Sequence, residues 1–150
     1  MKRKNKNEDN YIITIDNTQY HENGKDHFTL STVGDYISDG DTRIIKYRDS
    51  AATGFEGSET TLHVKPDMVT MVRTGEYASS LILEKGKRHT CHYGTPAGDL
   101  PLGINTTKFE SSLTDTGGTL DFSFSLDLNA NLFAATELKI TVREKNTPDA

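Results

Sequence analysis

Residues 120–128 alternate strictly between apolar and polar side chains, and this period of two constrains the fold more than any other feature of the chain. The apolar positions are Leu120, Phe122, Phe124, Leu126 and Leu128, and aspartate or serine fills the positions between them. Successive side chains of a β-strand point to opposite faces, so a strand places all five apolar residues on one face. A helix would scatter them around its circumference. The segment is therefore predicted to be a strand that is buried on one side.

The same alternation recurs along the chain. It is clear at residues 28–30, 62–64, 81–83 and 138–143, and weaker at 11–20, 42–48, 68–73, 87–93 and 102–113. These segments predict about ten strands. Compact turn signals rich in Gly, Asn, Asp and Pro separate them, and such short connections join antiparallel neighbours. The best helical window, residues 131–137, is short and runs into a strand pattern.

The predicted fold class is all-β, with a single antiparallel, mostly up-and-down barrel of about 8–10 strands. We prefer a barrel because closure removes exposed strand edges, and an open sandwich stays as the alternative. With 150 residues the chain has the size of one domain. We expect a disordered basic leader over residues 1–9, the barrel over 10–146 and a disordered tail over 147–150.

The charge balance argues against nucleic acid as a partner. The formal net charge is -5, and Lys2, Arg3, Lys4 and Lys6 all lie in the expected leader, so the remainder is more acidic still. An acidic surface repels phosphate backbones. The sequence contains no apolar run of about 18 residues that could cross a membrane and no signal-peptide core. Cys91 is the single cysteine and allows no internal disulfide, which favours a cytoplasmic location.

Short motifs between residues 47 and 122 carry a family resemblance. They are Tyr47-Arg48-Asp49-Ser50, Thr53-Gly54, Thr60-Thr61-Leu62, Arg73-Thr74-Gly75, Tyr93-Gly94-Thr95-Pro96-Ala97-Gly98, Gly103-Ile104-Asn105-Thr106 and Gly117-Gly118-Thr119-Leu120-Asp121-Phe122. In order and spacing they resemble the YwiB-like family of uncharacterised bacterial proteins, over about residues 30–145. The resemblance implies a calycin-like barrel, similar to lipocalins, and implies no activity. The chain departs from the family pattern at residues 89–92 and 133–135.

Tyr47, Arg73, Tyr93 and Thr95 are the candidate ligand-binding residues, and all lie in strands or motifs that carry the resemblance. Inside a barrel mouth, an arginine fork and two phenol hydroxyls can orient a carboxylate or another anionic group of a small molecule. The alternative is structural: Arg73 pairs with a carboxylate of the barrel wall, and the tyrosine rings pack at the rim.

The His-Thr-Cys-His stretch at residues 89–92 is the most suggestive local cluster. On a strand, His89 and Cys91 share one face and His92 points to the other. A structural zinc site needs four ligands, so metal binding by His89 and Cys91 stands only as an alternative to ordinary strand residues. For Cys91, a buried structural thiol is favoured over a nucleophile. We expect no cofactor.

Paired carboxylates do not form an acid–base pair in this chain. Asp39 and Asp41 flank a glycine in a turn, and Asp121 and Asp127 lie far apart along the outer face of one strand. The sequence has no nucleophile elbow, phosphate-binding loop or His-Glu-x-x-His helix.

Three interpretations of function follow. The first is a non-enzymatic barrel that binds a small molecule in its lumen. The second is a structural or protein-interaction module, such as a homodimer. An enzyme is the least favoured, because no convergent set of acid, base and nucleophile can be built from the sequence.

Overall fold

The computed structural model describes residues 10–49, 56–75, 78–95, 98–129 and 131–145, without the side chains of residues 93–95, 99, 132 and 133. The strands are β1 (Tyr11–His21), β2 (Gly24–Asp39), β3 (Thr42–Arg48), β4 (Ser58–Lys65), β5 (Met68–Gly75), β6 (Ser79–Glu84), β7 (Arg88–Thr95), β8 (Gly98–Ser111), β9 (Gly118–Leu128) and β10 (Asn131–Glu144). Each strand pairs with its neighbours in sequence, and β1 pairs with β10 to close the barrel.

The predicted all-β, antiparallel, up-and-down barrel is confirmed. Every predicted strand overlaps one of the observed strands, and residues 131–137, the best helical window, belong to β10. The expected leader and the expected tail lie outside the described residues. In the part of the chain that the structure describes, no helix is long and apolar enough to cross a bilayer.

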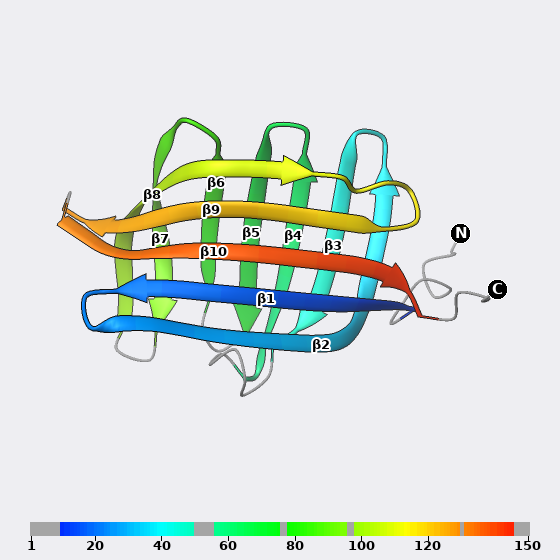
Figure 1. Cartoon of the computed structure of the whole chain (residues 1–150), viewed down its shortest axis with the longest axis horizontal. Helices are drawn as coiled ribbons and strands as arrows, with labels where there is room; N and C mark the ends of the chain where they lie inside the picture. Colours follow the sequence, from blue (N-terminus) through cyan, green and yellow to red (C-terminus); the bar gives the residue numbers. More distant parts are fainter. Residues whose placement is uncertain (1–9, 50–55, 76–77, 96–97, 130, 146–150) are drawn as a thin grey trace.

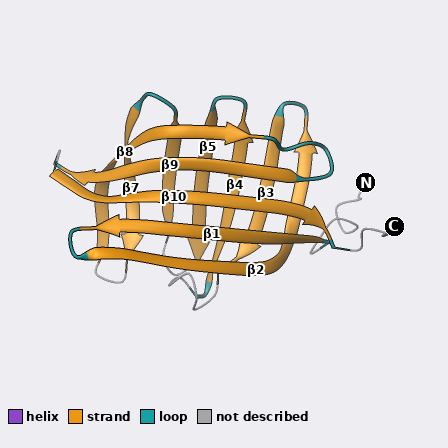
Figure 2. Ribbon diagram, in the orientation of Figure 1, coloured by secondary structure: helices purple, strands orange, loops and turns teal. Residues whose placement is uncertain are grey.

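The barrel is flattened into two layers whose strands run crosswise (Figure 1). The front layer contains β9, β10 and β1, and the back layer contains β3 to β7; loops and turns connect them without any helix among the described residues (Figure 2). Two long strands belong to both layers. β2 pairs with β1 up to Gly34 and with β3 from Gly34 onward, and β8 passes from β7 to β9 around Gly103.

The middle of the barrel is filled by apolar side chains. The inward positions with no exposed surface include Ile13, Ile45, Leu62, Leu102, Ile104, Leu120, Phe122 and Ile140. A side chain next to a water-sized void would show exposed surface, so these residues leave none in the middle of the interior. The middle of the described interior is therefore packed.

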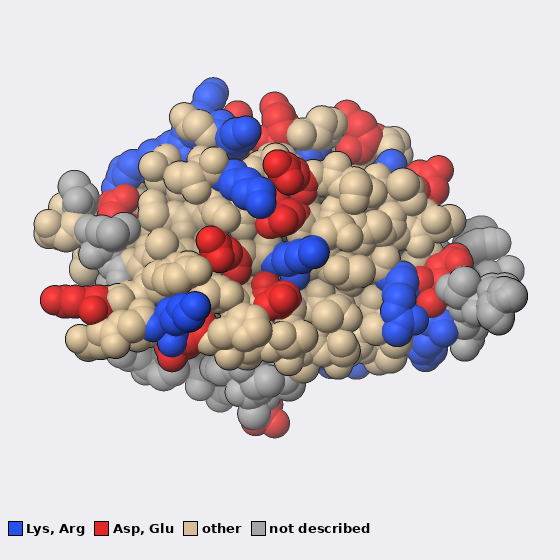
Figure 3. Space-filling view, viewed as in Figure 1, with Lys and Arg blue, Asp and Glu red and all other residues tan. Residues whose placement is uncertain are grey.

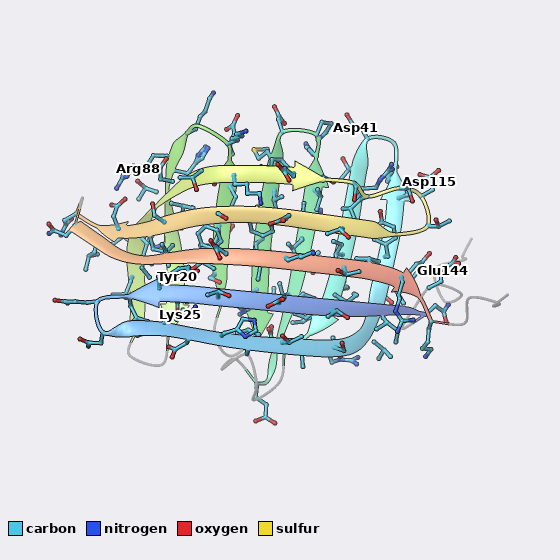
Figure 4. The ribbon with its side chains drawn as sticks, viewed as in Figure 1. Tyr20, Lys25, Asp41, Arg88, Asp115 and Glu144 are labelled. Carbon is cyan, nitrogen blue, oxygen red and sulfur yellow. The ribbon has the colours of Figure 1, made fainter. Side chains whose placement is uncertain are left out.

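The loop between β8 and β9 closes one corner of the barrel. The buried phenol of Tyr36 donates a hydrogen bond to the carbonyl of Thr114, and Leu113 packs against the core. Asp115 accepts a hydrogen bond from Ser38 at 2.8 Å and forms an ion pair with Arg43 at 3.2 Å. Figure 4 shows Asp115 at this corner, beside the turn that joins β2 to β3. The candidate ligand residues lie elsewhere.

Candidate functional site

One row of residues crosses the back layer near the lower ends of β3 to β7 in Figure 1. The pairing register places Tyr47 opposite Thr60, Thr60 opposite Arg73, Arg73 opposite Ser79 and Ser79 opposite Tyr93. Residues directly opposite each other on paired strands lie side by side. The register therefore aligns three of the four predicted ligand residues in a single row.

Arg73 is held by a carboxylate that directly follows the end of β3. Its Nε lies 3.5 Å from Oδ2 of Asp49, and the same oxygen accepts a hydrogen bond from the Thr60 hydroxyl at 2.7 Å. Arg73 is 8% exposed and Asp49 is 7% exposed. A buried charge is tolerated when an opposite charge and hydrogen bonds compensate it. In the structure Arg73 therefore pairs with a carboxylate, which is the structural alternative to a role in ligand binding.

Tyr47 lies beside this ion pair and keeps its proton. Burial, and next the carboxylate of Asp49, raise the pKa of the Tyr47 phenol far above its usual range, while Arg73 and Thr60 act in the opposite direction. A neutral phenol is a hydrogen-bond donor as well as an acceptor. The row, together with Asp49 beside it, thus combines a cation, a carboxylate and neutral hydroxyl groups.

Sequence reasoning missed Asp49, Thr60, Ser58 and Ser79, which are also buried at this end. The signal was present for Thr60 and Ser79, because both share the inward face of their strands with buried apolar residues. Asp49 follows the end of β3 and had no such signal, although its backbone amide bonds to the Ser58 carbonyl at 2.9 Å. The side chains of Tyr93 and Thr95 lie outside the described part of the structure.

His89 and Cys91 face inward on β7, and His92 is exposed on the opposite face, as predicted. His89 Nε2 lies 3.1 Å from a carboxylate oxygen of Glu84. Cys91 is buried, and its sulfur accepts a hydrogen bond from the Ile82 amide at 3.4 Å. Burial raises the pKa of the Cys91 thiol, although this bond partly opposes the shift. Among the described residues no three His, Cys, Asp or Glu side chains are grouped to hold a metal ion.

A family model described as "Domain of unknown function (DUF1934)" matches residues 13–140. The chain belongs to the DUF1934 family. The predicted likeness to YwiB is also confirmed: the barrel is similar to the crystal structure of the YwiB protein from Bacillus subtilis, with a TM-score of 0.77 and 15% identity, over 89% of this chain and 90% of that chain. At this identity the likeness shows the fold alone. No curated protein matches the chain.

This DUF1934 barrel also has a shallow groove of about 290 Å³ on the outer face of its front layer. Charged side chains of both signs gather there (Figure 3), among them Asp16, Asp121, Glu137, Lys108 and Lys139. Asp16 bonds to His27, and Asp121 pairs with Lys108 at 3.4 Å. Glu137 accepts a hydrogen bond from Tyr20 at 3.2 Å. Because the three carboxylates have partners, the groove has the character of a solvated sheet face.

Proposed function

We propose that this barrel binds a small molecule without catalysing a reaction, in the cytoplasm, at the end of the interior that holds the Tyr47–Arg73 row. The observation that carries the proposal is the gathering of Asp49, Thr60 and Arg73 at one end of an interior that is otherwise mostly apolar. Burying polar groups costs free energy, so proteins retain buried polar groups mainly where a site requires them. The packed middle of the barrel supports binding at this end over binding deep in a lumen.

The surroundings of the row indicate the chemistry of the ligand. Leu100 lies opposite Tyr93 at one end of the row, and Phe28 and Leu30 belong to the inner layer of β2. All three pack against the core and are only half-buried. These residues suit an apolar body, and the row suits a hydrogen-bonding head group. Since Asp49 already neutralises Arg73, a carboxylate head must compete with Asp49 for the guanidinium.

A second candidate is a protein-interaction module. Val33 and Ile37 are 40% and 41% exposed on the outer face of β2, and Tyr20 of β1 is 39% exposed, whereas the other large apolar residues among those described are more covered. Exposed apolar residues on the outer face of one strand favour contact with another protein.

Two measurements test the first proposal. Native mass spectrometry of untagged protein should detect a copurified small molecule. Titration with anilinonaphthalene sulfonate, an apolar anion, should show saturable binding of one probe per chain.

The variant that combines Asp49→Asn with Arg73→Gln removes both charges together, so it strands neither one. It should weaken probe binding about tenfold or more, because the anionic group loses its cation.

The matched control combines Arg88→Gln with Asp127→Asn, an ion pair on the outer face at 2.6 Å in which the Arg88 side chain is half-exposed. This variant should leave probe affinity unchanged. Tyr47→Phe removes one hydroxyl without a change of charge. Its probe affinity is measured instead if the variant that combines Asp49→Asn with Arg73→Gln does not fold. Wild-type protein that carries no molecule and shows no saturable probe binding would refute the proposal.

A further inference from the structure

Among the described residues, β2 is paired along only part of its second edge. Its first edge pairs with β1 from Gly24 to Gly34, but β3 covers the second edge only from Gly34 to Asp39. In the part of the chain that the structure describes, no strand occupies the second edge between Gly24 and Val33. Figure 1 shows this edge along the lower border of the front layer. Such an edge presents a row of backbone donors and acceptors to another strand.

The side chains of this edge favour pairing. Residues 28–33 read Phe-Thr-Leu-Ser-Thr-Val, with no charge, no glycine and no proline. β-branched and aromatic residues stabilise strands, and uncharged stretches of this composition readily add to other strands. Protected edges carry charges, bulges or proline, but here Lys25, Asp26 and His27 all lie at one end, and the pairing with β1 has no register shift. The uncharged half of the edge lacks these protective features.

We propose that this edge pairs with the same edge of a second copy of the chain, in an antiparallel arrangement around a two-fold axis at Thr29. A two-fold axis brings the same segment from both copies together, so one segment supplies the whole interface. β3 blocks the edge beyond Gly34, which confines the contact to residues 25–33. The pairing joins the two front layers into one continuous sheet.

The register follows from the side chains. With Thr29 on the axis, Phe28 lies opposite Leu30 of the second copy, and Leu30 lies opposite its Phe28. Both side chains are half-buried in one copy, and cross-strand pairs of aromatic and aliphatic residues are stabilising. Lys25 lies opposite Val33 and His27 opposite Ser31, so no charge faces a like charge. An interface of one strand pair is small, and we expect a weak dimer whose population depends on concentration.

Analytical ultracentrifugation over a concentration series tests the proposal. Wild-type protein should change from monomer to dimer as its concentration rises. Thr29→Lys places two ammonium groups opposite each other on the axis, and should raise the dimer dissociation constant about tenfold or more. Within one copy the new lysine lies opposite Asp16 on β1, which protects the fold.

Thr18→Lys is the matched control, because Thr18 lies on β1, one strand away from the edge, opposite Glu137. It should leave dimerisation unchanged. Thr29→Cys should form a disulfide-linked dimer on mild oxidation, and Thr18→Cys should not. A monomer at every concentration, or a dimer that Thr29→Lys does not weaken, would overturn the proposal. Concentration-independent protection of the 28–33 amides from hydrogen exchange would also overturn it, since the edge would then be covered within one molecule. The small-molecule proposal shares Phe28 and Leu30 with this interface, but it is tested by probe binding and the dimer by association, so either proposal can fail without the other.

Discussion

Two buried tyrosines, Tyr36 and Tyr47, make the stability of the fold depend on pH. Burial is the main cause that raises the pKa of both phenols, to about 12 for Tyr36 and further for Tyr47. The usual pKa of a tyrosine is 10.0. The folded protein thus keeps these protons at pH values where the unfolded chain loses them. Their contribution to stability is complete below pH 10 and is lost as the pH rises through the folded-state pKa.

We therefore predict a loss of stability between pH 10 and pH 12. Tyr36 contributes on the order of 2 kcal/mol to this loss. Urea unfolding measured at a series of alkaline pH values checks the prediction, and Tyr36→Phe should show a shallower decline of the unfolding free energy than the wild type. Equal slopes for the two proteins would contradict this explanation.

Gly34 lies where β2 leaves one layer for the other. A Cβ at this position would collide with the backbone carbonyl of Lys46 and with the side chain of Ile13. Gly103 occupies the corresponding place in β8, but the atoms nearest to a Cβ there belong to the guanidinium of Arg88. That side chain is 48% exposed and bonds to Asp127. The bend of β2 is thus in close contact with backbone, whereas the bend of β8 is in close contact with a side chain that can move.

Gly34→Ala is predicted to lower the free energy of unfolding by about 1–3 kcal/mol, because a backbone carbonyl cannot be moved without shifting a strand. Gly103→Ala is the comparison variant and should cost less, since the Arg88 side chain can turn toward solvent. Thermal or urea unfolding of both variants gives the answer. A larger cost at Gly103 would contradict the assignment of the tight bend to β2.

β6 and β7 form the weakest seam of the described barrel wall. Their pairing is confined to Ser79 with Tyr93 and Ser80 with His92, whereas β5 pairs with β6 from Met68 to Arg73. Beyond the two pairs, the contacts include the Ile82 amide on the Cys91 sulfur and His89 beside Glu84. Sulfur is a weak hydrogen-bond acceptor. This side of the wall is held mainly by side chains.

Hydrogen exchange should identify this seam. Successive amides of a strand point to opposite neighbours, so the Ile82 amide faces β7 while the Leu81 and Leu83 amides face β5. We expect Ile82 to exchange faster than Leu81 and Leu83 in the folded protein, as measured by NMR. Similar rates at the three amides would mean that the seam is as well protected as its neighbours.

On the scale of the molecule, the meander brings the first and last strands of the chain together. The Lys145 amide donates a hydrogen bond to the Asn10 carbonyl at 2.8 Å, and β1 pairs with β10 along nearly its whole length. Closure therefore depends on strands at opposite ends of the chain. Glu144 belongs to the last residue pair between β1 and β10. Figure 4 shows the labelled Glu144 at the same side of the barrel as the start of β1.

A circular permutant should keep the fold. We predict that a short glycine linker from Lys145 to Asn10, with new ends in the exposed turn at Pro66 and Asp67, gives a barrel that unfolds in one cooperative transition. The contacts are unchanged, and only the order of chain closure differs. Circular dichroism and thermal unfolding check this. Loss of the cooperative transition would show that the β4–β5 turn is required for folding.

The sequence by itself determined the strands and the side of each strand that faces inward. Alternation such as that in residues 120–128 is a local property, and the inward set of β9 is the predicted one. Turn chemistry also ordered the strands, because short connections force neighbours to pair. These features depend on residues a few positions apart, so a single sequence is sufficient to read them.

Only the tertiary structure decided which inward residues meet. Alternation says that Tyr47 and Arg73 face the interior, but register decides that Thr60 lies between them and that Asp49 reaches Arg73. The bends of β2 at Gly34 and of β8 around Gly103 set how the two layers cross. Register and bending depend on packing between residues far apart in the chain, and a period of two carries no information about them.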